Sequence, residues 1–76
     1  MNKKRRDILQ SARPLLSQAA RIIERVAEQE EDCLDNFPEN LQSTDRYEKM
    51  EKAIENLEAA LEHIENAQDC ISEAVT

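Results

Sequence analysis

The residues that could carry acid–base or metal chemistry in this chain are its carboxylates, its single histidine and its two cysteines. Asp and Glu together number 17 among 76 residues, and the one histidine is His63. A di-metal centre in a helical bundle needs Glu-x-x-His sequences whose side chains point inward. The residue three positions before His63 is Ala60, and the periodicity described below places His63 on an outer face. We therefore expect no metal site and no cofactor.

Cys33 and Cys70 are the candidates for a thiol nucleophile or a disulfide. The fold expected below puts them near opposite ends of the molecule, beyond the roughly 6 Å between Cα atoms that a disulfide requires. A catalytic thiol needs a histidine base within reach, and His63 lies two turns from Cys70 on the same helix. We expect reduced thiols, with Cys33 at the core or its rim and Cys70 exposed.

Composition argues against an enzyme. The chain has no Gly and no Trp, only 3% aromatic residues, and 36% charged residues. Phosphate-binding loops and nucleophile elbows both need glycine. Low aromatic and β-branched content disfavours a sheet. The remaining alternatives are a disordered acidic chain and one small all-α domain, and the hydrophobic periodicity favours the all-α domain.

Charge is unevenly distributed along the chain. Residues 1–25 carry a net +5 and residues 26–76 a net −12. Such an asymmetry can mark an arm that contacts nucleic acid. The candidate phosphate contacts are Lys3, Lys4, Arg5, Arg6 and Arg13. We prefer the interpretation that an antiparallel hairpin lays the basic segment beside the acidic one, because no aromatic residue interleaves the basic run and the net charge is −7.

The second half of the chain has an unbroken heptad pattern that predicts a helix over about residues 44–75. Its apolar positions alternate three and four apart, with one polar member. These positions are Tyr47, Met50, Ile54, Leu57, Leu61, Ile64, Gln68, Ile71 and Val75. Alanines repeat along one flank of this seam and glutamates along the other, at Ala53, Ala60, Ala67, Ala74, Glu51, Glu58 and Glu65. Ser43 or Thr44 is the expected N-cap.

The first half predicts a helix over about residues 4–35 with a wider apolar stripe. One row contains Ile8, Ala12, Leu15, Ala19, Ile22 and Val26, continuing to Gln29 and Cys33. A second row, one position further round, contains Leu9, Leu16 and Ile23. Pro14 removes a helical hydrogen bond. The helix therefore either begins near Ser11 or begins earlier and kinks near Pro14, and we favour the kinked helix.

Residues 36–43 form the expected loop. Phe37 precedes a proline and is expected to be extended, and Asn36, Asn40 and Ser43 are typical turn residues. Phe37 and Leu41 are expected to plug the end of the bundle. A loop of this length lets the two helices lie antiparallel, so the predicted fold is an all-α two-helix hairpin.

A two-helix hairpin cannot bury three apolar rows by itself, so we expect two copies to form a four-helix bundle. The row Leu9, Leu16 and Ile23 is assigned to the intermolecular surface, because the first row already faces the second helix. The seam residues expected to complete the oligomer interface are Ile54, Leu57, Leu61, Ile64 and Ile71.

The expected function is a non-enzymatic, self-associating structural or interaction module, a homodimer in the cytoplasm. No apolar run approaches the roughly 20 residues of a membrane span, and the residues after the basic start do not match a signal peptide. One alternative is a nucleic-acid-associated regulator that uses the basic N-terminal segment. Another is an inhibitor whose acidic second helix occupies a DNA-binding protein. Its acidic face contains Glu48, Glu51, Glu55, Glu58, Glu62, Glu65 and Asp69.

The loop and the helix after it resemble a group of small uncharacterised bacterial proteins. The resemblance rests on Asp35-Asn36-Phe37-Pro38-Glu39-Asn40-Leu41-Gln42-Ser43-Thr44 and on the run from Glu48 to Ala60. Those proteins look like helical hairpins from Gram-positive genomes and mobile elements, and the resemblance implies no activity. It covers roughly residues 28–75, whereas Pro14 and the Lys-Lys-Arg-Arg start depart from the pattern. In architecture alone, the expected dimer is similar to the Rop-type RNA-binding dimer of hairpins.

Overall fold

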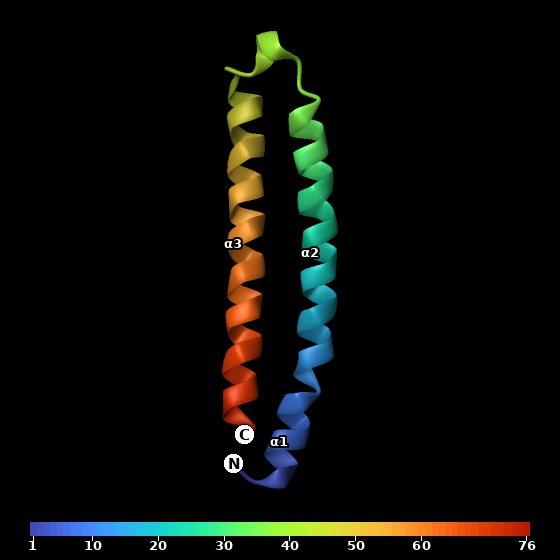
Figure 1. Cartoon of the computed structure of the whole chain (residues 1–76), viewed down its shortest axis with the longest axis vertical. Helices are drawn as coiled ribbons and strands as arrows, with labels where there is room; N and C mark the ends of the chain where they lie inside the picture. The colour runs from blue at the N-terminus through green and yellow to red at the C-terminus, as the bar shows by residue number, and fades with distance from the viewer.

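A computed structural model describes all residues from 1 to 76 and shows an antiparallel helical hairpin (Figure 1). Its elements are α1 (Lys3–Gln10), α2 (Ala12–Asp35), the short 3-10 helix η1 (Glu39–Leu41) and α3 (Asp45–Ala74). The molecule measures 59 × 15 × 13 Å. The predicted all-α hairpin is confirmed.

The first arm of the hairpin is one bent helix that begins at Lys3. Asn2 caps its start by accepting a hydrogen bond from the backbone N–H of Arg5, with an N···O distance of 2.9 Å. The bend lies at Ser11, whose N–H donates to the Ile8 carbonyl instead of the carbonyl four residues back. Pro14 explains the place of the bend, because its ring crowds the carbonyl of Gln10 and offers no N–H to it.

The connection between the helices is closed by local hydrogen bonds. The Asn36 side chain donates to the Asp32 carbonyl at 2.8 Å, which satisfies a free carbonyl at the end of α2. Thr44 is the N-cap of α3, and its hydroxyl accepts from the N–H of Tyr47. Phe37 packs edge-on against Tyr47, with 5.4 Å between ring centroids. Leu41 is 42% exposed, so the expectation that it plugs this end is wrong.

The seam of α3 is the one expected from its heptads. All nine heptad positions from Tyr47 to Val75 are buried or half-buried, and Ile54 is only 7% exposed. Most side chains between them are exposed. The 3–4 spacing therefore identified the α3 surface that packs on α2.

The two apolar rows on the first arm have the opposite roles from those expected: the row assigned to the intermolecular surface is half-buried, and the other row is exposed. Leu9, Leu16 and Ile23 are half-buried, and Leu16 and Ile23 belong to the side of α2 that packs on α3. The other row stays exposed: Ile8 at 63%, Leu15 at 65%, Ile22 at 60% and Val26 at 42%. The seam row continues through Ala20, Ala27 and Leu34. Ala27 in this row is only 6% exposed, so the two helices lie close together at this position.

The hairpin buries little of its own apolar surface. Only Ala27, at 6% exposure, and Ile54, at 7%, are buried, and no side chain is fully buried. Two helices side by side have no third layer to cover their seam, so most core residues keep one side open to water. Apolar surface left exposed in this way marks a site of association.

Candidate interaction surfaces

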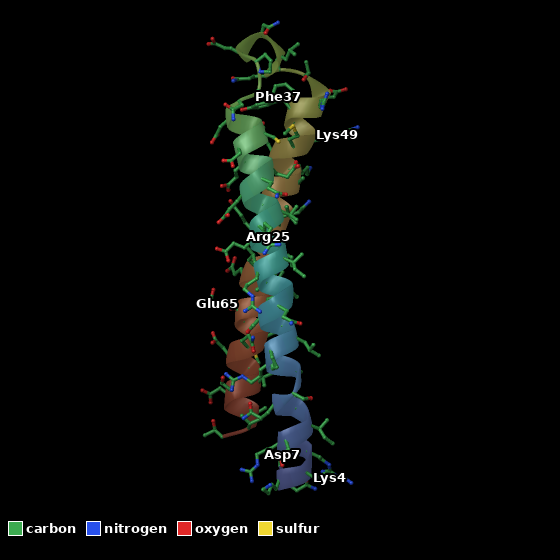
Figure 2. All side chains as sticks on the ribbon, turned by 90° about the vertical axis from the view of Figure 1, so that its right-hand side faces the viewer. Lys4, Asp7, Arg25, Phe37, Lys49 and Glu65 are labelled. Carbon is green, nitrogen blue, oxygen red and sulfur yellow. The ribbon has the colours of Figure 1, made fainter.

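The hairpin has two chemically different broad faces. Antiparallel helices bring matching flanks of their seams together, and on one such flank the carboxylate of Glu31 on α2 lies near that of Glu58 on α3. Figure 2 shows oxygen-tipped side chains along the edge where Glu65 lies, and carbon side chains along the lower part of the opposite edge, whose upper end carries charged side chains such as Lys49. One face is therefore acidic and the other is apolar.

We use the name apolar face for the surface opposite the acidic flank. The exposed aliphatic row of the first arm and the alanine flank of the α3 seam contribute to it. Its members are Ile8, Ala12, Leu15, Ala19, Ile22, Val26, Ala53, Ala60, Ala67 and Ala74. Large side chains thus line one half of the face and small ones the other. The four large residues are those that the structure leaves most open among the aliphatic residues of α1 and α2.

Repulsion between carboxylates dominates the acidic face. The pKa of Glu31 is raised above its ordinary value of 4.5, first by its hydrogen bond to Glu58 and then by partial desolvation. The negative charges of Glu58, Asp35 and Glu28 raise it further. A shared proton stabilises such a pair, whereas two ionised carboxylates repel each other.

A polar layer crosses the seam near the open end of the hairpin. The Gln68 amide donates to the carbonyl of Arg13 and to the hydroxyl of Ser17, both at 3.1 Å. The guanidinium of Arg13 in turn donates to the Ser72 hydroxyl at 2.9 Å. The Gln68 side-chain carbonyl oxygen is buried without a hydrogen-bond donor. Arg13, a predicted phosphate contact, therefore binds α3 and is half-buried.

The other predicted phosphate contacts lie on α1. Lys3 forms an exposed ion pair with Asp7, with 3.2 Å between the ammonium nitrogen and the carboxylate oxygen. Lys4 and Arg5 are exposed, and Arg6 is half-buried. Figure 2 shows Lys4 at the tip of the molecule, on the helix that also carries Asp7. The structure thus leaves two fully exposed cations, Lys4 and Arg5, without an ion-pair partner at this end.

The residues assigned to an oligomer interface fall into one group. Leu16 and Ile23 are half-buried on α2, which packs against α3, and Leu9 is half-buried on α1. The five assigned α3 residues, Ile54, Leu57, Leu61, Ile64 and Ile71, are buried or half-buried within the hairpin. The sequence analysis did not identify the row that begins at Ile8 as the outward surface. The last positions of this row could have indicated it, because they are polar Gln29 and exposed Cys33. The seam row ends instead in the apolar residues Leu34 and Phe37.

The remaining candidates for chemistry are dispersed. His63, Cys33 and Cys70 are all exposed, so the expectation of Cys33 at the core or rim is wrong. No three His, Cys, Asp or Glu side chains converge as a metal site would require. No helix combines the length and the apolar character needed to cross a bilayer.

Comparison with known proteins adds no relative. Neither the family models, nor the curated proteins, nor the solved structures contain a match to this chain. The resemblance of residues 28–75 to bacterial hairpin proteins thus stays a hypothesis, and function must be argued from the surfaces themselves.

Proposed function

We propose that the protein is a non-enzymatic, self-associating helical module in which two hairpins pack through their apolar faces into a four-helix bundle. The observation that carries this proposal is the row of four large aliphatic side chains, each 42–65% exposed, on one side of the hairpin. Burying a large aliphatic side chain contributes roughly 1.5–3 kcal/mol, so leaving four of them in water is costly.

The apolar face has the size and character of a dimer interface. The outline of the whole hairpin, 59 by 15 Å, encloses about 900 Å², so one broad side has room for the roughly 800 Å² that each partner buries in a standard stable interface. Isologous contacts need one surface that complements itself. Large residues on the first arm and alanines on α3 meet this need, because projections and recesses occur on the same face.

The opposite face explains why assembly stops at two copies. The acidic flank carries Glu51, Glu58 and Glu65 on α3 and Glu24 and Glu31 on α2. A second hairpin that approached this side would bury unpaired carboxylates, which is strongly unfavourable. Association through one face only closes as a dimer and leaves the acidic face in water.

The test is the mass in solution. Light scattering should give about 17.6 kDa, twice the 8.8 kDa of one chain. Ile22→Glu should return the mass to that of one chain with helicity retained. Arg21→Glu is the matched control, because it places the same side chain one residue away, off the apolar face, and should remain dimeric. A wild-type mass of 8.8 kDa at micromolar concentration would overturn the proposal.

A second candidate function is contact with nucleic acid through the exposed cations of α1. Lys4 and Arg5 support it, because neither is paired with an acidic side chain. Binding through these cations should weaken with added salt, with a slope set by the small number of phosphates they contact. Absence of binding to duplex DNA and single-stranded RNA at low salt would eliminate it.

The third candidate is an acidic inhibitor of a DNA-binding protein, which relies on the α3 carboxylates. It predicts that reversing Glu55, Glu58 and Glu62 to Lys abolishes capture of a basic partner. Unchanged capture by that triple variant would rule it out.

A further inference from the structure

We infer that the hollow beside the loop is a binding site for α1 of a second copy of this chain, so that the two hairpins pair with their loops at opposite ends. This inference rests on the proposed self-association, and it specifies which parts of the two copies meet. The hollow, the overhang of α1, the charge at each end and the spacing of the exposed row all support it.

The hollow lies where α2, the loop and α3 meet. It has a volume of about 480 Å³ and is open to solvent. Its lining includes Cys33, Phe37, Pro38 and Met50, with Glu30 and Arg46 at its polar edge. Cys33 also ends the exposed row of α2, so the hollow continues the apolar face.

Helix α1 is the part of the molecule that most lacks a partner. It extends past the C-terminal end of α3, so no second helix of its own chain accompanies it (Figure 1). None of its residues is buried, and Ile8 is 63% exposed. Met1, just before the helix, is also 63% exposed. The exposed side chains of Met1 and Ile8 at one end of the hairpin thus complement the open apolar hollow at the other end.

Charge favours the reversed pairing of the two copies. Helix α1 has a net charge of +3, and the loop end of the hairpin, residues 28–52, has a net charge of −6, although Arg46 is itself part of the hollow's lining. Reversed hairpins lay each basic α1 beside the acidic end of the other copy. Hairpins with both loops at one end would instead put two basic helices together and two acidic loop regions together, which is repulsive.

The exposed row has the same spacing when read in either direction. Its positions run from Ile8 to Cys33 and are symmetric about the point between Ala19 and Ile22. An antiparallel pair of α2 helices centred there places Ile8 opposite the partner's Cys33 position and Leu15 opposite Val26. It also sets Ile22 against Ala19, so a large side chain meets a small one at the two-fold axis.

Cys33 provides a direct test of this arrangement. In the variant Ile8→Cys with Cys70→Ser, residues 8 and 33 of one chain are about 37 Å apart along the helix, so they cannot bond within it. Mild oxidation with diamide should give a covalent dimer through a disulfide between position 8 and Cys33 of different copies. Peptide mapping by mass spectrometry identifies the bond.

The control variant removes Cys33 as well. Ile8→Cys with Cys33→Ser and Cys70→Ser should stay uncrosslinked, because the two copies of position 8 lie at opposite ends of the bundle. Efficient bonding between the two copies of position 8, with none to Cys33, would overturn the reversed arrangement and leave self-association intact. A wild-type mass of one chain would instead overturn the proposed function itself.

Charge reversal tests the electrostatic part independently. Lys4→Glu with Arg5→Glu, and separately Asp32→Lys with Asp35→Lys, should each weaken the dimer at least tenfold at low salt. An equimolar mixture should recover wild-type affinity, because a reversed heterodimer satisfies both ends. Stronger homodimers from either double variant would contradict the inference, since charge reversal relieves repulsion only when like ends meet.

Discussion

At the scale of single residues, polar side chains occupy positions where apolar ones would stabilise the hairpin more. Gln68 occupies a seam position, and only its amide nitrogen is satisfied, by Arg13 and Ser17. Its buried carbonyl oxygen has no donor. Unsatisfied buried polar atoms cost free energy, and they are retained where they select one register among several.

Replacing Gln68 by Leu should therefore raise the free energy of unfolding by about 1 kcal/mol. Urea unfolding monitored by circular dichroism measures it. Asn66→Leu, on the exposed surface of the same helix, is the control and should change stability little. A less stable Gln68→Leu variant would show that the bonds of the polar layer outweigh the unpaired oxygen.

The Glu31–Glu58 pair predicts a dependence of stability on pH. The folded state raises the pKa of Glu31 above 4.5, so its contribution to stability is present below that value and is lost as pH rises through the folded pKa. Glu58→Gln removes the repelling charge. Relative to wild type, this variant should gain stability as the solution becomes neutral, when urea midpoints are compared across pH.

Glu62→Gln is the control for that comparison. It removes one carboxylate from the exposed surface of α3, and Glu62 is not among the groups that raise the pKa of Glu31. If each variant differed from wild type in stability by the same amount at every pH, the prediction would be contradicted.

At the scale of elements, the two arms differ in how firmly their sequences specify a packing surface. Helix α3 has one apolar seam between an alanine flank and a glutamate flank, so only one orientation buries it. The α1–α2 arm has two adjacent apolar rows and therefore two possible orientations. The structure uses the row with Ala20 and Ala27, and Pro14 bends the arm at Ser11.

Leu61→Ala should lower the free energy of unfolding by about 2 kcal/mol, because it truncates a half-buried residue in the middle of the α3 seam. Leu41→Ala is matched in chemistry and lies in the loop, where Leu41 is 42% exposed, so its effect should be small. Denaturant midpoints for the two variants give the comparison. Equal effects would argue against the seam.

At the scale of the whole molecule, the hairpin is long and thin, and only two of its residues, Ala27 and Ile54, are buried. Its shape, 59 Å long and 13–15 Å thick, puts nearly every residue near the surface. Small folds without disulfides or metals compensate by association. In the dimer that we propose, the apolar face supplies the surface, and the contrast between the basic α1 and the acidic loop end supplies an orientation.

If folding and association are coupled, the melting temperature must depend on protein concentration. Thermal unfolding by circular dichroism should shift upward by several degrees over a hundredfold increase in concentration. Ile22→Glu should melt lower and without this dependence. A concentration-independent wild-type transition would indicate that one chain is stable by itself.

The sequence by itself determined the helices, the loop between them and the seam of α3. These features depend on local properties, namely the heptad spacing from Tyr47 to Val75, the cap at Thr44 and the missing N–H of Pro14. An antiparallel hairpin followed from the loop length. Side chains three and four apart share one side of a helix whatever lies opposite, so such features can be recognised without a partner.

The tertiary structure decided which row of the first arm meets α3. Ile8 and Leu9 begin two rows of similar hydrophobicity, and these rows are offset from each other by one residue around the helix. The choice depends on contacts across the seam, such as the burial of Ala27 and the hydrogen bond from Gln68 to Ser17. Those contacts join residues about fifty positions apart, and the pattern of one helix contains no information about them.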